Sequence, residues 1–152
     1  MSYLNINLKG GKLMIFIIGG EHQGKLNYAL TLTEFKNEDV LDCSKMHNLK
    51  LNEMKKCNKK VLYNLNILIK ELLRAYDDEE TVKEKIRIMF KDCRISVVIS
   101  NEIGYGIVPI DRFERRYREL TGRICCDIAK ESKEVHRVVC GIGTLIKGGK
   151  YD

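Results

Sequence analysis

The sequence lacks any apolar run close to the roughly 20 residues that a helix needs to cross a bilayer. Its opening twelve residues also lack the apolar stretch of a secretory signal. We therefore expect a soluble, cytoplasmic protein with no membrane partner. The six cysteines include no Cys-x-x-Cys pair and no metal-ligand spacing, so we expect neither a zinc site nor a disulfide framework. Internal repeats and low-complexity tracts are absent as well.

The composition fits one folded core. The chain has 152 residues, 44% of them hydrophobic, which is enough for one sizeable core but not for two large domains. Residues 1–12 are polar with paired glycines, and we interpret them as a loose extension of a single domain over residues 13–152. The net charge of +6 suits either an anionic small molecule or a solvated basic surface, and we expect no nucleic acid partner.

Strand and helix patterns alternate along the chain. Short apolar runs predict buried strands at Leu13–Ile18, Asp39–Cys43, Val61–Leu65, Ile95–Ile99 and Val135–Cys140. Helical spacing of apolar residues follows these runs at about 25–35, around Ile69–Leu73, over Asp77–Asp92 and after Asp111. This order predicts an α/β fold of three layers, with a mostly parallel sheet and ligands at the carboxyl ends of its strands.

Two local signals mark the ends of elements in the last third of the chain. Asp111 and Glu114 have the spacing of a capping box, so we expect a long helix to begin there. We expect the strand at Val135–Cys140 to be the last one, stopped by the glycines of Gly141-Ile142-Gly143.

A phosphate-binding loop is predicted between the first strand and the first helix. The pattern G-x-x-x-x-G-K is formed by Gly19, Gly20, Glu21, His22, Gln23, Gly24 and Lys25. Its backbone N–H groups would surround the phosphates of GTP or ATP, and Lys25 would reach the outer phosphates. The alternative is a simple glycine-rich turn. His22 would face either a phosphate or solvent.

The residues expected to hold Mg²⁺ depart from the usual pattern. Leu26 follows the loop lysine where a Ser or Thr hydroxyl would bind the metal, and leucine offers no ligand. Asn64 ends the third strand where an aspartate would be expected. Asp42 and Glu102 also lie near the ends of strands. Each carboxylate would either approach a bound metal or accept a proton; the alternative is that it accepts hydrogen bonds from loop backbone. We therefore assign no metal ligand.

One stretch of the chain resembles a known family. Ile95–Lys147 contains the distinctive NEIGYGIVP sequence at Asn101–Pro109 and ends in a strand with a glycine pair. The following helix carries the spaced residues Arg112, Arg116, Leu120 and Gly122. Together with the amino-terminal loop, this combination resembles the adenosylcobinamide kinase / adenosylcobinamide-phosphate guanylyltransferase family of cobalamin biosynthesis, of which this chain would be a shortened and degenerate member.

The resemblance implies a P-loop NTPase-like fold, a homotrimer and two reactions. These are phosphorylation of adenosylcobinamide by a nucleoside triphosphate and transfer of GMP from GTP onto that phosphate. In the family a histidine between the second and third strands carries the GMP. Here that segment is cut to about residues 44–60, and its one histidine, His47, is either the nucleophile or a surface residue. Cys125-Cys126 stands where the family usually has a polar pair.

Three functions remain open from the sequence. The first is an adenosylcobinamide kinase with impaired guanylyl transfer, in which Lys25, Glu102 and His47 are the candidate catalytic residues. The second is an inactive nucleotide-binding or assembly paralogue, and the third is an unrelated P-loop domain. The loop Glu102–Pro109 would either contact substrate or make a tight turn that packs Val108-Pro109 at a subunit interface.

Overall fold

The structure, a computed structural model, describes residues 14–46, 58–104 and 106–149. The predicted extension at residues 1–12 and the candidate nucleophile His47 lie outside this part of the chain.

Six strands of the described residues form one sheet in the order β2-β3-β4-β1-β5-β6. Their bounds are β1 Ile15–Gly19, β2 Val40–Asp42, β3 Val61–Tyr63, β4 Val97–Asn101, β5 Glu134–Val139 and β6 Ile142–Lys147. The neighbours from β2 to β5 pair in parallel, whereas β6 pairs antiparallel to β5. The five predicted strands are therefore confirmed, each within a few residues of its expected bounds.

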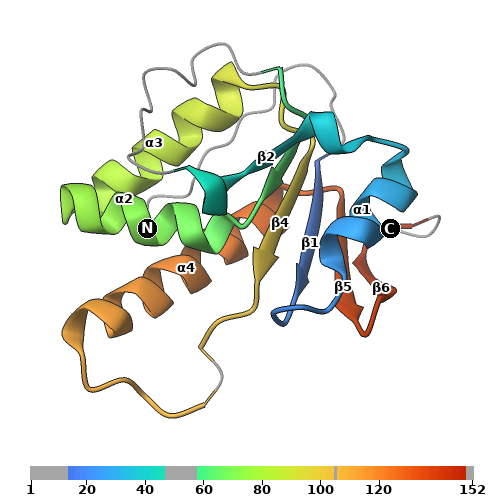
Figure 1. The fold of residues 1–152 in the computed structure, drawn as a ribbon. Helices are drawn as coiled ribbons and strands as arrows, with labels where there is room; N and C mark the ends of the chain where they lie inside the picture. The colour runs from blue at the N-terminus through green and yellow to red at the C-terminus, as the bar shows by residue number, and fades with distance from the viewer. Residues whose placement is uncertain (1–13, 47–57, 105, 150–152) are drawn as a thin grey trace.

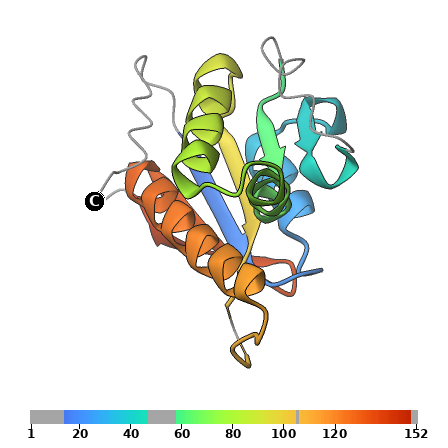
Figure 2. The same cartoon turned by 90° about the vertical axis from the view of Figure 1, so that its left-hand side faces the viewer.

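Helices cover both faces of this sheet. Helix α1 (Lys25–Thr33) lies on one face, and α2 (Leu65–Tyr76), α3 (Glu79–Asp92) and α4 (Arg112–Glu131) lie on the other (Figures 1 and 2). The smaller apolar cluster joins Ala29 of α1 to Ile17 and Ile99 in the sheet. The larger one packs the three other helices on the opposite face. The predicted three-layer α/β fold with a mostly parallel sheet is confirmed.

The prediction that the strand at Val135–Cys140 is the last one is wrong, because a further strand, β6, follows it. Cys140 and Gly141 have φ of 51° and 77°, and two successive left-handed residues make the tight turn typical of a β-hairpin. The chain therefore reverses after Val139 and continues as β6.

Helix α4 begins where predicted, but the predicted capping box does not form. Asp111 accepts a hydrogen bond from the N–H of Phe113 at 2.8 Å, which caps the helix. Glu114 instead pairs with Lys70 of α2, with 2.9 Å between carboxylate oxygen and Nζ. The carboxylate of Glu114 therefore pairs with the ammonium group of Lys70, and does not accept a hydrogen bond from the backbone N–H of Asp111.

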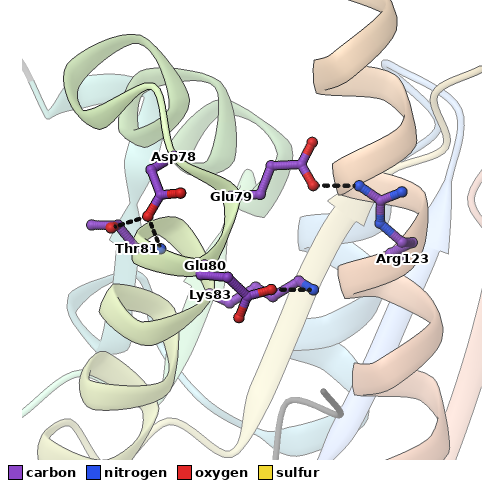
Figure 3. Close-up of polar contacts among 6 residues, drawn as sticks. All are labelled: Asp78, Glu79, Glu80, Thr81, Lys83 and Arg123. Atoms are coloured by element: carbon purple, nitrogen blue, oxygen red, sulfur yellow. Dashed lines mark hydrogen bonds and ion pairs between the residues drawn. The ribbon is translucent and has the colours of Figure 1, made fainter. Parts of the chain in front are cut away.

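The start of α3 is held by side chains drawn in Figure 3. Asp78 accepts a hydrogen bond from the N–H of Thr81 at 3.1 Å and so caps the helix. Glu79 pairs with Arg123 of α4 at 2.7 Å, which joins the two helices across the layer.

Within residues 14–46, 58–104 and 106–149, no helix combines the length and the apolar character needed to span a membrane.

Candidate functional site

The predicted phosphate loop connects the end of β1 to the start of α1. Gly24 precedes the first helical residue with φ of 84°, a left-handed conformation that glycine adopts without strain. The first turn of α1 contains no acidic residue, and no side chain caps its N–H groups at Gly24. These N–H groups and the positive end of the helix dipole are therefore available to an anion.

Lys25 folds back over the loop. Its Nζ donates a hydrogen bond to the carbonyl oxygen of Gly20 at 2.5 Å, and the residue is only 4% exposed. Burial lowers the pKa of Lys25 from its ordinary value, while the negative charges of Glu21 and Glu102 act in the opposite direction. The ammonium group thus lies within the loop, close to the amino terminus of α1.

The β5–β6 turn anchors the loop from the other side. The N–H of Cys140 donates to Oε1 of Gln23 at 2.8 Å, and the N–H of Gly141 donates to the carbonyl oxygen of Gln23 at 2.7 Å. Gln23 is therefore fixed through both its side chain and its backbone, and its side chain is directed at the hairpin.

Glu102 connects the neighbouring strand to the same loop. Its N–H donates to the carbonyl oxygen of Gly19 at 2.8 Å. Its carboxylate, with 12% of the side chain exposed, accepts two hydrogen bonds from Arg137 of β5, from Nε at 2.7 Å and from Nη2 at 3.1 Å. The guanidinium and carboxylate therefore form a two-pronged ion pair, the strong geometry for these groups.

Asp42 and Asn64, which end neighbouring strands, bind each other. Oδ1 of Asp42 accepts from the amide nitrogen of Asn64 at 2.9 Å and from the N–H and hydroxyl of Ser44 at 2.9 and 2.6 Å. Burial by itself would raise the pKa of Asp42, but the hydrogen bonds from Ser44 and Asn64 bring it below its ordinary value. Asp42 is thus held as a carboxylate by local donors.

Two other predicted loop residues, His22 and Leu26, place no polar side-chain atom inside the loop. The side chain of His22 is 90% exposed, and its Nε2 lies 3.6 Å from Oε1 of Glu21. His22 has φ of 57°, an uncommon conformation for a residue other than glycine. Leu26 is half-buried and packs against the apolar cluster beneath α1.

The segment after Glu102 carries exposed apolar side chains. Ile107 is 92% exposed and Val108 is also exposed. Arg115 and Arg118 of α4 donate to backbone carbonyl oxygens of this segment, at Pro109 (3.1 Å) and Ile107 (3.2 Å) respectively. The arginines on the outer side of α4 thus hold the segment in place.

Sequence reasoning missed Arg137 and the anchoring turn. Arg137 lies in a strand that also contains Glu134 and His136, so its charge alone gave no signal that would have singled it out. Its partner Glu102 is 35 positions away, so the pair depends on β4 and β5 both lying beside β1.

A strand, a G-x-x-x-x-G-K loop and a helix, set in a largely parallel sheet, define a P-loop α/β fold. The sequence pattern of one family, described as cobinamide kinase / cobinamide phosphate guanyltransferase, matches residues 41–146. The chain belongs to this family.

Two curated relatives match a shorter region. The bifunctional adenosylcobalamin biosynthesis protein CobU of Salmonella typhimurium is 37% identical over 73 residues, and the protein of the same name from Escherichia coli is 36% identical over 73 residues. Each match covers 45% of this chain and 40% of the relative. The matched region thus spans about two fifths of the length of these relatives.

Proposed function

We propose that this protein binds GTP or ATP at Gly19–Leu26 and transfers the terminal phosphate to adenosylcobinamide in cobalamin biosynthesis. The observation that carries the proposal is the buried ammonium of Lys25, which lies within the loop at the amino terminus of α1. In phosphoryl transfer, the protein acts mainly by positioning the reactants and stabilising charge, and a loop lysine and helix amino terminus serve both purposes. The family description, cobinamide kinase / cobinamide phosphate guanyltransferase, supports a cobinamide as the acceptor.

In this proposal the phosphorus–oxygen bond to the leaving nucleoside diphosphate breaks while a substrate hydroxyl forms the new bond. Lys25 stabilises the charge on the transferred phosphoryl group. Glu102 is the candidate acceptor for the hydroxyl proton, because its backbone is anchored to the loop at Gly19. His47 is the one candidate for carrying GMP, and without the family's flanking residues we expect guanylyl transfer to be impaired.

The proposal extends to the organisation of the protein. We propose that residues 13–152 act as a single cytoplasmic P-loop domain, since all the described strands belong to one sheet. We also propose the homotrimer expected from the family resemblance. The exposed Ile107 and Val108, on a segment fastened by α4, support a subunit contact there.

A second candidate function is an inactive nucleotide-binding or assembly paralogue. The observation in its favour is that Leu26 and Asn64 occupy the positions from which a P-loop enzyme holds Mg²⁺. Such a protein would keep the fold and lose the chemistry.

One assay separates the two candidates. Purified protein is incubated with adenosylcobinamide and ATP or GTP labelled in the terminal phosphate, and label is sought in the corrinoid. Transfer in the wild type that is lost in Lys25→Ala supports the kinase. Nucleotide binding without any transfer of label overturns the kinase and leaves the paralogue.

A further inference from the structure

The side chains around the phosphate loop do not suit the magnesium ion that P-loop proteins use. In such proteins a Ser or Thr hydroxyl after the loop lysine and a carboxylate at the end of another strand of the sheet hold the ion. Leu26 occupies the first position and packs with the apolar residues beneath α1. A hydrocarbon side chain in this position supplies no oxygen, so that ligand is missing.

The second position is also unsuited to the ion. Asn64 is neutral, and its amide nitrogen donates to Oδ1 of Asp42. That same oxygen also accepts both hydrogen bonds from Ser44. Three donors share Oδ1, so Asp42 could offer a cation only its other oxygen, Oδ2.

Glu102, the remaining candidate carboxylate, is neutralised. Arg137 donates to both of its oxygens, at 2.7 and 3.1 Å. A cation approaching this carboxylate would meet the guanidinium charge at close range. The same ion pair offsets the negative charge that Glu102 would otherwise direct at a phosphate bound beside Lys25. Arg137 thus disfavours a metal ion and favours an anion at the same place.

We propose that the phosphate loop binds the nucleoside triphosphate without a divalent cation. Arg137 is the positioning residue, which neutralises Glu102 beside the loop. This inference rests on the proposed nucleotide binding and goes beyond it. In place of a magnesium ion, Lys25 and the N–H groups at the start of α1 balance the phosphate charge, and the neutralised Glu102 does not oppose them. Wild-type affinity is then the same for the free nucleotide and for its magnesium complex.

Replacing Arg137 by alanine changes this balance in a specific way. Glu102 becomes an uncompensated negative charge that repels phosphate, so affinity in the absence of metal falls. The freed carboxylate is at the same time available to Mg²⁺, so added metal restores part of the affinity. The double variant Arg137→Ala/Glu102→Gln lacks both charges and regains binding that is indifferent to metal.

The test is calorimetric titration of the full chain with GTP and with ATP, in EDTA and in MgCl₂. The expected results are wild-type dissociation constants that agree within about threefold between the two conditions, and at least about tenfold weaker binding by Arg137→Ala in EDTA that Mg²⁺ improves. Thermal unfolding of each variant shows that the comparison concerns folded protein. The double variant, compared with Arg137→Ala, distinguishes the charge effect from general damage to β5.

Three results would overturn the inference. Wild-type binding that is strengthened more than about tenfold by Mg²⁺ contradicts it and leaves the proposed nucleotide binding intact. An Arg137→Ala variant with wild-type affinity in both conditions would show that Arg137 does not assist binding by neutralising Glu102. Absence of binding by the wild type in both conditions overturns this inference and the proposed function together.

Discussion

Oε1 of Gln23 accepts a hydrogen bond from the N–H of Cys140 at 2.8 Å, across 117 positions of the chain. The contact joins the phosphate loop to the turn between β5 and β6, and the carbonyl oxygen of Gln23 adds a second bond to Gly141. Because the loop's own glycines leave it conformationally free, this external anchor restricts the conformations that the loop adopts.

The first prediction concerns this anchor. Gln23→Ala removes the side-chain acceptor, so we expect a stability loss of about 0.5–1.5 kcal/mol and several-fold weaker nucleotide binding. Gln23→Glu is the matched control for the stability measurement, because its carboxylate keeps an oxygen for Cys140. Its added negative charge would itself weaken nucleotide binding, so it is not used for that comparison. Urea unfolding and calorimetry measure the two effects. Equal nucleotide affinities for Gln23→Ala and the wild type would show that the anchor does not shape the loop.

The second prediction compares two glycines. A Cβ at Gly19 would lie 2.4 Å from the backbone oxygen of Val138, and backbone cannot move aside cheaply. We expect Gly19→Ala to cost about 1–3 kcal/mol of unfolding free energy. A Cβ at Gly122, inside α4, meets nothing within 4 Å, so Gly122→Ala should stabilise by about 0.5–1 kcal/mol. Chemical denaturation gives both values, and changes of the same sign would contradict the packing described here.

The third prediction concerns two adjacent cysteines. Cys125 is buried and its thiol lies 3.9 Å from the hydroxyl oxygen of Ser100, and burial raises the pKa of Cys125 to about 11. Cys126 is exposed. At neutral pH iodoacetamide should therefore modify Cys126 much faster than Cys125, because the thiolate is the reactive form.

Mass spectrometry of digested, briefly labelled protein measures this difference. The control is labelling in denaturant, where both thiols should react at similar rates. Equal labelling of the two cysteines in the native protein would mean that α4 does not bury Cys125 as described.

The fourth prediction concerns acid stability. Hydrogen bonds from the hydroxyl and N–H of Thr81 lower the pKa of Asp78 from its ordinary value of 3.8 (Figure 3). A carboxyl group with a lowered pKa stabilises the fold above the ordinary value, and the contribution is lost as pH falls through the folded value. Asp78→Asn keeps the acceptor but does not titrate, so its unfolding free energy should fall less steeply below about pH 4.

Urea unfolding of both proteins between about pH 2 and 6 checks this expectation. Parallel curves for the wild type and Asp78→Asn would contradict the assigned role of the ionised cap.

The fold was largely predictable because local patterns determine most of it. Apolar runs such as Ile95–Ile99 and the periodic apolar residues of α4 each require burial, and their alternation leaves few topologies. The strand β6 was missed because Ile142 and Ile146 are exposed and because glycines at 141 and 143 indicated a stop. The glycine at 141 instead serves a turn that reverses the chain.

The site was only partly predictable. The loop and Lys25 follow from a motif within seven successive residues, so the sequence alone identifies them. The pairing of Glu102 with Arg137 and of Gln23 with Cys140 depends on which strands become neighbours, which no local pattern specifies. The structure also shows how Asn64 binds Asp42, a contact that the sequence reasoning did not anticipate.

The most direct test of the account is calorimetric titration of the purified protein with GTP and ATP, alongside Lys25→Ala. Lys91→Ala is the matched control, since Lys91 is an exposed lysine at the end of α3, away from the loop. We predict saturable binding by the wild type and Lys91→Ala, and loss of binding in a folded Lys25→Ala protein. Absence of binding by the wild type, or unchanged affinity in Lys25→Ala, would contradict the claim that this loop is a nucleotide site.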